Sequence, residues 1–247
     1  MLHWNRGNRS LSRRQFSDIV DCLQTGDLIV RNNTRVIYAR FRGVRDTTGG
    51  AIEVLFQHPC EPDGRSYDLE PYRFDNERIR RWLVLTKSGG KLRDGETLTL
   101  GEGLKVLILK RLGLEGDVVS IEGDAQILAA ELSLSDETQA IRRTAEIPLP
   151  PYIRRESGHP ENDESRAYQT VYASQPGAIA APTAGLHFTP QILETLAARG
   201  IAVADITLHV GAGTFRPVQT DDAESHSMHN EWFNVSEAAA SRINAAK

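Results

Sequence analysis

The sequence predicts an α+β fold, in which a mixed α/β domain carries an inserted small β domain. Short strand-like runs separated by turn residues extend from Gly43 to about Ile127, and this spacing is typical of a small barrel or sandwich. Strand, helix and strand then follow one another up to Leu208, an order typical of an α/β layer. We therefore expect a discontinuous α/β domain over residues 1–43 and 130–247, with the inserted β domain, a small barrel or sandwich, over residues 44–129.

Length and composition are those of an ordinary globular protein. The 247 residues are 40% hydrophobic and 25% charged, which supplies enough apolar material for a proper core. The sequence shows neither an apolar signal segment nor an apolar run long enough to cross a bilayer. Its two cysteines, Cys22 and Cys60, cannot build a disulfide framework or a cysteine-based zinc site. We expect a cytoplasmic protein without a membrane partner.

The first half of the chain is expected to be mostly strand. Apolar residues at helical spacing predict one short amphipathic helix over Ser12–Leu23. Strands are predicted at Leu28–Val30 and Arg35–Phe41, with Asn32-Asn33-Thr34 as a turn or an irregular crossing between them. In the inserted domain we expect a long loop over Cys60–Asn76 and strands at Ala51–Phe56, Trp82–Thr86, Thr97–Leu100, Leu104–Leu109 and Val118–Ile121.

Helix signals concentrate in the second half. A helical stretch is predicted around Asp136–Arg143. Thr189-Pro190 is a typical helix start, and Gly200 is a typical helix end. Ile201–Leu208 is a nearly continuous strand pattern. Ser236 is expected to cap a final alanine-rich helix that continues to the last residue.

Charge is unevenly distributed along the chain. The formal net charge is −4, yet residues 1–50 contain nine arginines, no lysine and four aspartates. An arginine-rich lobe on an acidic body is compatible with holding a nucleic-acid backbone. An ordinary solvated charged face explains the same composition.

Two glycine-containing loops are the best candidates for a small-molecule pocket. Thr183-Ala184-Gly185-Leu186-His187 precedes the capped helix, where free N–H groups favour an anionic ligand. Gly211-Ala212-Gly213-Thr214-Phe215 follows the strand that ends at His209, and ligands of α/β sheets bind beyond such strand ends. Arg216 could reach a carboxylate or a phosphate. An ordinary turn with a satisfied histidine is the alternative for the first loop.

Three further groups of polar or aromatic residues allow two interpretations each. His226, His229 and Glu231 could bind zinc, but a histidine spacing of three does not match the helical metal motif, and proton transfer needs the same residue types. Asn32, Thr34 and Arg35 fit either a structural turn or a binding segment. Tyr168 and Tyr172 lie four residues apart, as in core packing or in stacking on a base.

The ordered motifs together resemble the S-adenosylmethionine:tRNA ribosyltransferase-isomerase family of queuosine biosynthesis. The matching blocks cover essentially the whole chain, and the last three are highly specific: G-D-L-I-V-R-N-N-T-R-V-I-Y-A-R from Gly26, P-L-P-P-Y-I from Pro148, Y-Q-T-V-Y-A from Tyr168, A-A-P-T-A-G-L-H-F-T from Ala180, T-L-H-V-G-A-G-T-F-R-P-V from Thr207 and H-S-M-H-N-E-W-F from His226.

This resemblance implies a monomeric, cytoplasmic tRNA-modifying enzyme with a barrel inserted in a mixed α/β domain. Its reaction would transfer and isomerise the ribosyl part of S-adenosylmethionine onto 7-aminomethyl-7-deazaguanine in tRNA. The products would be epoxyqueuosine-tRNA, adenine and methionine. S-adenosylmethionine would be a co-substrate, and the family is expected to use no metal and no resident cofactor.

Such a reaction needs a base for the C5′ proton beside the sulfonium, a donor for the departing adenine and an acceptor for the amine proton. The candidates for these proton transfers are His187, His209, His229 and Glu231. The S-adenosylmethionine pocket is expected to include Thr183, Ala184, Gly185, Phe188, Gly211, Gly213, Thr214 and Arg216. Substrate contacts are expected from Asn32, Thr34, Arg35, Tyr168 and His226.

The chain also departs from the family pattern. Members usually carry a segment ahead of the position of Met1 and continue well past Lys247, so we expect sheet strands and part of the pocket wall to be missing. Asn33 stands where aspartate is usual, and Tyr38 where proline is usual. A second hypothesis is therefore a truncated, inactive relative that binds tRNA or nucleotide without turnover. A metal hydrolase is a third.

Overall fold

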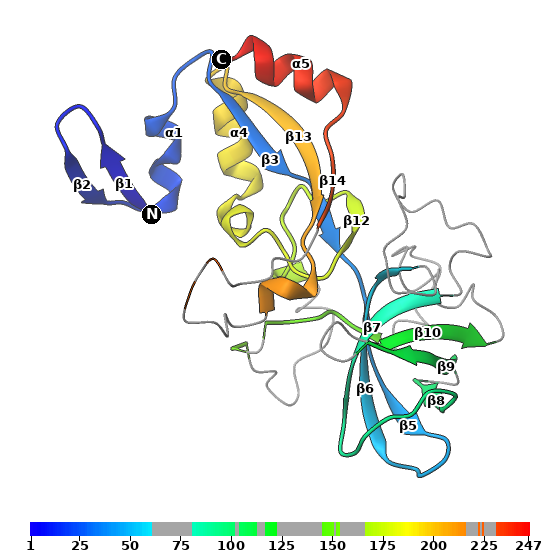
Figure 1. Cartoon of the computed structure of the whole chain (residues 1–247). Helices are drawn as coiled ribbons and strands as arrows, with labels where there is room; N and C mark the ends of the chain where they lie inside the picture. Colours follow the sequence, from blue (N-terminus) through cyan, green and yellow to red (C-terminus); the bar gives the residue numbers. More distant parts are fainter. Residues whose placement is uncertain are drawn as a thin grey trace.

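The computed structural model confirms the α+β fold class (Figure 1). It describes residues 1–60, 81–101, 104–112, 117–122, 145–150, 152–153, 166–215, 222, 224 and 231–247. A barrel of antiparallel strands lies beside a second region, in which short mixed sheets are flanked by helices (Figure 1). Helices α4 (Pro190–Ala198) and α5 (Glu237–Ala245) have nine residues each, and no helix in the described ranges is long and apolar enough to span a bilayer.

Six strands form the barrel. They pair in the order β5-β6-β7-β10-β9-β8, and β8 pairs back onto β5, so the ring of hydrogen bonds closes. Closure leaves these strands without a long free edge. The bounds are β5 (Arg40–Arg45), β6 (Ala51–Pro59), β7 (Arg81–Ser88), β8 (Thr97–Leu100), β9 (Leu104–Arg111) and β10 (Asp117–Glu122).

Alternate side chains of β6, β8 and β9 are buried inside the barrel. Phe56 lies between Phe41 and Trp82, in edge-to-face contacts with centroid distances of 5.1 and 5.8 Å. Gly43 marks the position where β5 pairs with β6 on one side and β8 on the other. A Cβ there would lie 2.1 Å from the carbonyl oxygen of Thr99, so only glycine permits this approach.

The second region is built on parallel strand pairs. β3 (Leu28–Asn32) lies parallel to β13 (Ala202–His209), and β14 (Trp232–Asn234) adds antiparallel to β13 on its other side. β4 (Thr34–Val36) lies parallel to β12 (Gln175–Ala178). Helix α5 packs on β13, while α4 contacts the short helix α1 (Ile19–Cys22).

The predicted helix boundaries of this region are confirmed by their caps. The Thr189 hydroxyl accepts from the backbone N–H of Ile192 at 3.3 Å, and Gly200, with φ of +75°, follows the end of α4. The Ser236 hydroxyl accepts from the N–H of Ala239 at 3.2 Å. Helix α5 ends at Ala245, slightly before the predicted end at the last residue.

Two predicted elements have different bounds in the structure. Residues Ser12 and Arg13 were assigned to a helix but belong to β2 (Ser10–Arg13), which pairs with β1 (Leu2–Asn5). Helical structure begins only at the 3₁₀ helix η1 (Phe16–Asp18), after a capping box between Gln15 and Asp18. The single strand predicted over Arg35–Phe41 is interrupted after Val36 and resumes at Arg40 as β5.

The interruption is a buried crossing from one sheet to the other. Ile37, Tyr38 and Ala39 are all buried, and they share one hydrophobic core with barrel residues and with Ala178. The N–H of Ile37 donates to the carbonyl of Ala178 at 3.0 Å, while the carbonyl of Ala39 accepts from Phe56 at 2.9 Å. Barrel and second region therefore meet without a solvated linker at this crossing.

The barrel sheet takes in residues on both sides of the predicted domain boundaries. It begins at Arg40, and the short strand β11 (Ala145–Glu146) pairs with β5. The division into two domains stays a prediction. The predicted helix at Asp136–Arg143 and, apart from Cys60, the predicted loop over Cys60–Asn76 lie outside the described residues.

A buried ion pair holds the end of β5 against the loop before β8. Arg45 donates to both carboxylate oxygens of Glu96, at 2.5 and 2.9 Å, and the Glu96 side chain is only 4% exposed. Thr47 and the backbone N–H of Arg93 donate to the same carboxylate at 3.1 Å. Hydrogen bonds from Arg45 are the main cause that lowers the pKa of Glu96. Glu96 therefore stabilises the fold at neutral pH, and this contribution is lost as the pH falls through the lowered pKa.

We expect Glu96→Gln to lower the free energy of unfolding by about 2 kcal/mol at neutral pH, because Arg45 then loses its charged partner in a largely buried place. Urea unfolding followed by circular dichroism measures the change. Asp21→Asn is the matched control, since it breaks an exposed pair with Arg199 and should cost less than about 1 kcal/mol. Equal effects of the two substitutions would contradict a special role for Glu96.

Candidate active site

The site begins where β3 passes into β4, and a side-chain amide shapes this passage. The Asn32 carboxamide donates to the carbonyl of Leu208 at 2.9 Å and accepts from the Leu208 N–H at 3.0 Å. The same oxygen accepts from the N–H of Thr34 at 3.1 Å. The amide thus continues the pairing of β3 with β13 where the backbone of β3 turns away.

Asn33 fixes the same passage from the other side. Its backbone N–H donates to Ile206, and its side-chain oxygen accepts from the hydroxyl of Thr207 at 2.7 Å. Its carbonyl accepts from the N–H groups of Ser174 and Gln175, at the start of β12. Asparagine at this position therefore makes local structural contacts to two neighbouring strands.

This passage places Thr34 against His209 at the end of β13. The Thr34 hydroxyl lies 2.7 Å from Nδ1 of His209, and both residues are buried. The two are 175 positions apart in the sequence. The structure therefore joins a predicted substrate contact to a predicted proton-transfer residue in one hydrogen-bonded pair.

Burial and stacking define the environment of His209. Its ring stacks on the indole of Trp232, with centroids 4.8 Å apart and an angle of 20° between the rings. Burial lowers the pKa of His209 from 6.5 to about 4, because the charged imidazolium would lose its hydration. The imidazole is therefore neutral at physiological pH and can accept a proton or a hydrogen bond.

The glycine loop after His209 is bound by the carboxylate of Glu231. The backbone N–H of Gly211 donates to the exposed side chain of Glu231 at 2.9 Å. The carbonyl of Val210 accepts from the N–H groups of Ile179 and Ala180, at 2.9 and 3.1 Å. The segment that leads into the first glycine loop therefore lies directly beside the second loop.

The first loop is the 3₁₀ helix η6 (Thr183–His187), and its glycine serves packing. A Cβ on Gly185 would lie 2.3 Å from the hydroxyl oxygen of Tyr172 and 2.9 Å from the methyl of Thr170. Neither Gly185 nor Gly211 adopts a positive φ. The backbone of Gly185 therefore lies close to the side chain of Tyr172. Thr183 and Ala184, in the same loop, are exposed.

Aromatic rings and an arginine gather beside η6. Phe16 contacts the rings of His187 and Phe188, with centroid distances of 5.2 and 5.0 Å. The Arg31 guanidinium lies 4.3 Å from the ring centroid of Tyr172 and pairs with Asp205 at 2.5 Å. His187 is exposed and belongs to this aromatic cluster.

The other predicted site residues fall into three groups. Arg35 and Thr214 are exposed, and Gly213 is half-buried, with Gly213 and Thr214 in the 3₁₀ helix η7 (Ala212–Phe215). Tyr168 is buried in the core at 5% exposure, a place that favours packing over base stacking. Arg216, His226 and His229 lie outside the described residues. Within the described ranges, no three His, Cys, Asp or Glu side chains gather as a metal site.

Two further residues, Gln169 and Trp232, shape the site and are not among the candidates predicted from the sequence. Gln169 accepts from the N–H of Val36 at 3.0 Å and donates to its carbonyl at 2.8 Å, so a side chain again replaces a strand neighbour. Trp232 belongs to the block H-S-M-H-N-E-W-F from His226. Its position directly after Glu231 is the signal in the sequence that could have identified it.

Known proteins match this chain along nearly its whole length. The model of a family described as queuosine biosynthesis protein matches residues 1–247. The S-adenosylmethionine:tRNA ribosyltransferase-isomerases of Syntrophotalea carbinolica and Symbiobacterium thermophilum are 43% and 39% identical over 244 residues, which make up 98% of this chain and 62% of each relative. The protein of the same name from Maricaulis maris is 40% identical over 253 residues, 100% of this chain and 64% of that relative.

The chain therefore spans somewhat less than two thirds of the length of these relatives. A crystal structure of S-adenosylmethionine tRNA ribosyltransferase from Thermotoga maritima is 19% identical, with a TM-score of 0.31, over 99% of this chain and 56% of that one. That likeness is too weak to compare the folds in detail. The family match over every residue and relatives at about 40% identity are decisive: the chain belongs to the queuosine biosynthesis protein family.

Proposed function

We propose that this chain transfers and isomerises the ribosyl part of S-adenosylmethionine onto 7-aminomethyl-7-deazaguanine in tRNA, giving epoxyqueuosine-tRNA. Its family and the names of its relatives support the reaction class. S-adenosylmethionine is the co-substrate in this proposal, and no metal or resident cofactor takes part. We further propose that the protein acts as a monomer in the cytoplasm.

The observation that carries the proposal is the buried pair of Thr34 and His209. The reaction requires a group that accepts the C5′ proton, which the neighbouring positive sulfur makes acidic. The lowered pKa keeps His209 neutral, so it does not repel the sulfonium, while the same shift makes the imidazole a weaker base than an unperturbed histidine. The hydrogen bond to Thr34 fixes the imidazole in one orientation. We assign proton acceptance at C5′ to His209.

Glu231 and the loop after His209 complete the proposed pocket. The exposed, negatively charged carboxylate of Glu231 accepts a hydrogen bond from the backbone N–H of Gly211, the second residue after His209. A carboxylate in this place favours both the sulfonium and the protonated amine of the deazaguanine. We assign Glu231 to binding of these cations and to removal of the amine proton.

The first test is adenine release. The chain, incubated with S-adenosylmethionine and precursor-bearing tRNA, should release adenine. His209→Gln should lower the rate by roughly 100-fold or more, the size of a general-base contribution. Thr34→Val should lower it by roughly 10-fold, because the imidazole loses its orienting partner at nearly constant volume. Chromatography of the released base measures both.

His58→Gln is the matched control, because it removes a different histidine, which is half-buried and lies on β6 of the barrel. Its rate should stay near that of the wild-type chain. Retained tRNA binding with no adenine from the wild-type chain would instead support the second hypothesis, a relative that binds without turnover.

The lowered pKa of His209 also predicts a pH-dependent stability. Between its unfolded value of 6.5 and its folded value of about 4, only the unfolded chain binds the proton. The free energy of unfolding therefore falls as the pH decreases through this window, and this group has little effect above it. From pH 7 to pH 5 the wild-type chain should lose about 2 kcal/mol more than His209→Gln. Urea titrations at both pH values measure the difference, and parallel losses would refute the buried neutral imidazole.

A further inference from the structure

The hairpin of β1 and β2 carries an apolar face that the proposed chemistry does not use. Residues two apart along a strand, and residues directly opposite each other on paired strands, lie on the same face of a sheet. Leu2 pairs with Arg13 and Trp4 pairs with Leu11, so these four side chains share one face. Leu2, Trp4 and Leu11 are 71%, 53% and 62% exposed. A large indole and two leucines therefore lie in solvent beside an arginine.

The opposite face of the hairpin is turned toward the protein. His3 and Ser12 lie on that face, and both are half-buried. Figure 1 shows the hairpin beside α1 and away from the barrel. A two-stranded hairpin gains little stability by itself, and a cluster of exposed apolar side chains marks a contact surface. The face that carries Trp4 is thus open to a partner.

The structure separates most of the nine arginines of residues 1–50 into two groups. One group is paired with carboxylates in the folded body, and its pairs are Arg31 with Asp205, Arg40 with Glu53, Arg42 with Glu146 and Arg45 with Glu96. The other group, Arg6, Arg9, Arg13 and Arg14, is exposed on the hairpin or directly after it. Within the described ranges, no side chain of this second group forms an ion pair or a hydrogen bond. Residues 1–17 contain no Asp or Glu, so the hairpin is a place of concentrated positive charge.

The turn of the hairpin is ordered by two asparagines. The Asn5 side-chain oxygen accepts from the backbone N–H of Gly7 at 2.9 Å, and that of Asn8 accepts from the N–H of Ser10 at 3.1 Å. Arg9 in this turn has a φ of +53°, a conformation that glycine or asparagine adopts more readily than arginine. The arginines of the turn are therefore presented to solvent from a defined backbone.

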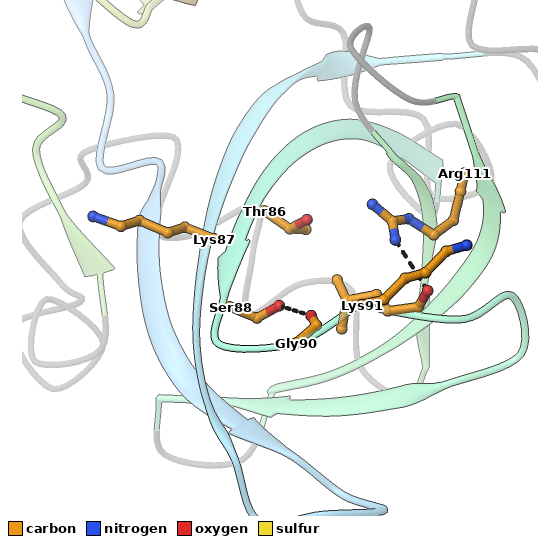
Figure 2. Close-up of a pocket in the computed structure, with 7 residues that line it drawn as sticks. Thr86, Lys87, Ser88, Gly90, Lys91 and Arg111 are labelled. Carbon is orange, nitrogen blue, oxygen red and sulfur yellow. Dashed lines mark hydrogen bonds between the residues drawn. The ribbon is translucent and has the colours of Figure 1, made fainter.

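A second group of cations lines a recess of the barrel, but it is less suited to a partner. Lys87, Lys91 and Arg111 belong to this lining (Figure 2). The Arg111 guanidinium donates to the carbonyl of Leu92 at 3.0 Å and so helps to hold the loop after β7. Figure 2 shows the Lys87 side chain extending away from the ring of strands. The lining contains no aromatic ring, whereas the hairpin combines exposed cations with an exposed indole.

An exposed indole among arginines suits unpaired RNA better than it suits another protein surface. A second copy of the hairpin would bring two sets of arginines together, and like charges repel. An apolar protein surface would cover Trp4 but leave the neighbouring guanidinium groups without partners. Unpaired RNA offers bases that stack on an aromatic ring and phosphates that bind arginine. We propose that the hairpin binds an unpaired stretch of the RNA substrate, with a base on Trp4 and a phosphate at Arg13.

This inference rests on the proposed function, because it assumes that the chain acts on RNA. Fluorescence anisotropy of a labelled tRNA transcript, titrated with the full chain at several salt concentrations, tests it. Trp4→Leu keeps the face apolar but removes the ring, and it should weaken binding by at least about fivefold, the lower end of a stacking contribution. Arg13→Ala should weaken binding roughly two- to fivefold. It should also reduce the slope of log K against log salt by about 0.7, the value for one phosphate contact of a single strand.

Two matched variants control for the ring and for the charge. Trp4→Phe keeps an aromatic ring and should retain most of the affinity. Arg42→Ala removes the same charge from an exposed side chain of the barrel, where Glu146 already balances it. Its affinity and salt slope should stay close to the wild-type values. Equal effects of Arg13→Ala and Arg42→Ala would reveal a general charge effect and overturn the hairpin as a contact.

A blunt RNA duplex distinguishes base stacking from general attraction to RNA. Its bases are paired inside the helix and offer no free face to the indole. Trp4→Leu should therefore leave the affinity for the duplex unchanged while it weakens binding of the tRNA. The same loss for both RNAs would contradict a base on Trp4.

The other possible occupants have their own measurements. Vesicles of phosphatidylserine and phosphatidylcholine test a lipid surface, and sedimentation of the chain alone tests a second copy. Vesicle binding or self-association that Trp4→Leu abolishes, with unchanged affinity for tRNA, would overturn the inference. If the wild-type chain releases adenine and the hairpin variants bind tRNA as it does, the inference fails while the proposed function stands. Absence of tRNA binding by the wild-type chain would overturn both.

Discussion

The side chain of Asn32 is the contact on which the arrangement of the site depends. A β-strand can change partners only if its freed backbone groups find new ones, since buried unpaired amides are costly. The Asn32 carboxamide supplies the missing pair to Leu208, and its oxygen also receives the N–H of Thr34. This permits β3 to end beside β13 and β4 to begin beside β12. Thr34 consequently faces the end of β13, where His209 lies.

His209 shows how burial can set a chemical property. Desolvation by itself lowers the pKa to about 4, and the stacked indole of Trp232 takes the place of water on one face of the ring. A neutral imidazole suits the proposed co-substrate, because the sulfonium and an imidazolium would repel strongly in a poorly hydrated place. The exposed Glu231 carboxylate supplies the opposite charge at the next loop.

The elements that depend on local interactions could be predicted from the sequence. Thr189 and Ser236 cap their helices, and the alternating runs form the barrel strands. Elements that depend on distant partners were missed. β1 was not predicted, because Leu2–Asn5 shows little alternation and forms a strand only by pairing with β2. The interruption after Val36 depends on the amide of Gln169, 133 positions away.

The same distinction applies to the candidate site. The motifs identified His209, Thr34, Gly211 and Glu231 as separate candidates, because residue type and loop position are visible in a sequence. That Thr34 contacts His209, or that Glu231 holds Gly211, depends on strand pairing across long separations. Gly185 was expected to line a ligand pocket. In the structure the neighbouring Tyr172 hydroxyl leaves no room for a side chain there, which gives a different reason for glycine at this position.

The buried crossing at Ile37, Tyr38 and Ala39 has a consequence for how the chain tolerates mutation. These three residues lie in one core with barrel residues and with Ala178, so they cannot be repacked for one side alone. A large-to-small or small-to-large substitution here would disturb the barrel and the strand that carries Thr34 together. The crossing therefore couples the stability of the barrel to the geometry of the pair formed by Thr34 and His209.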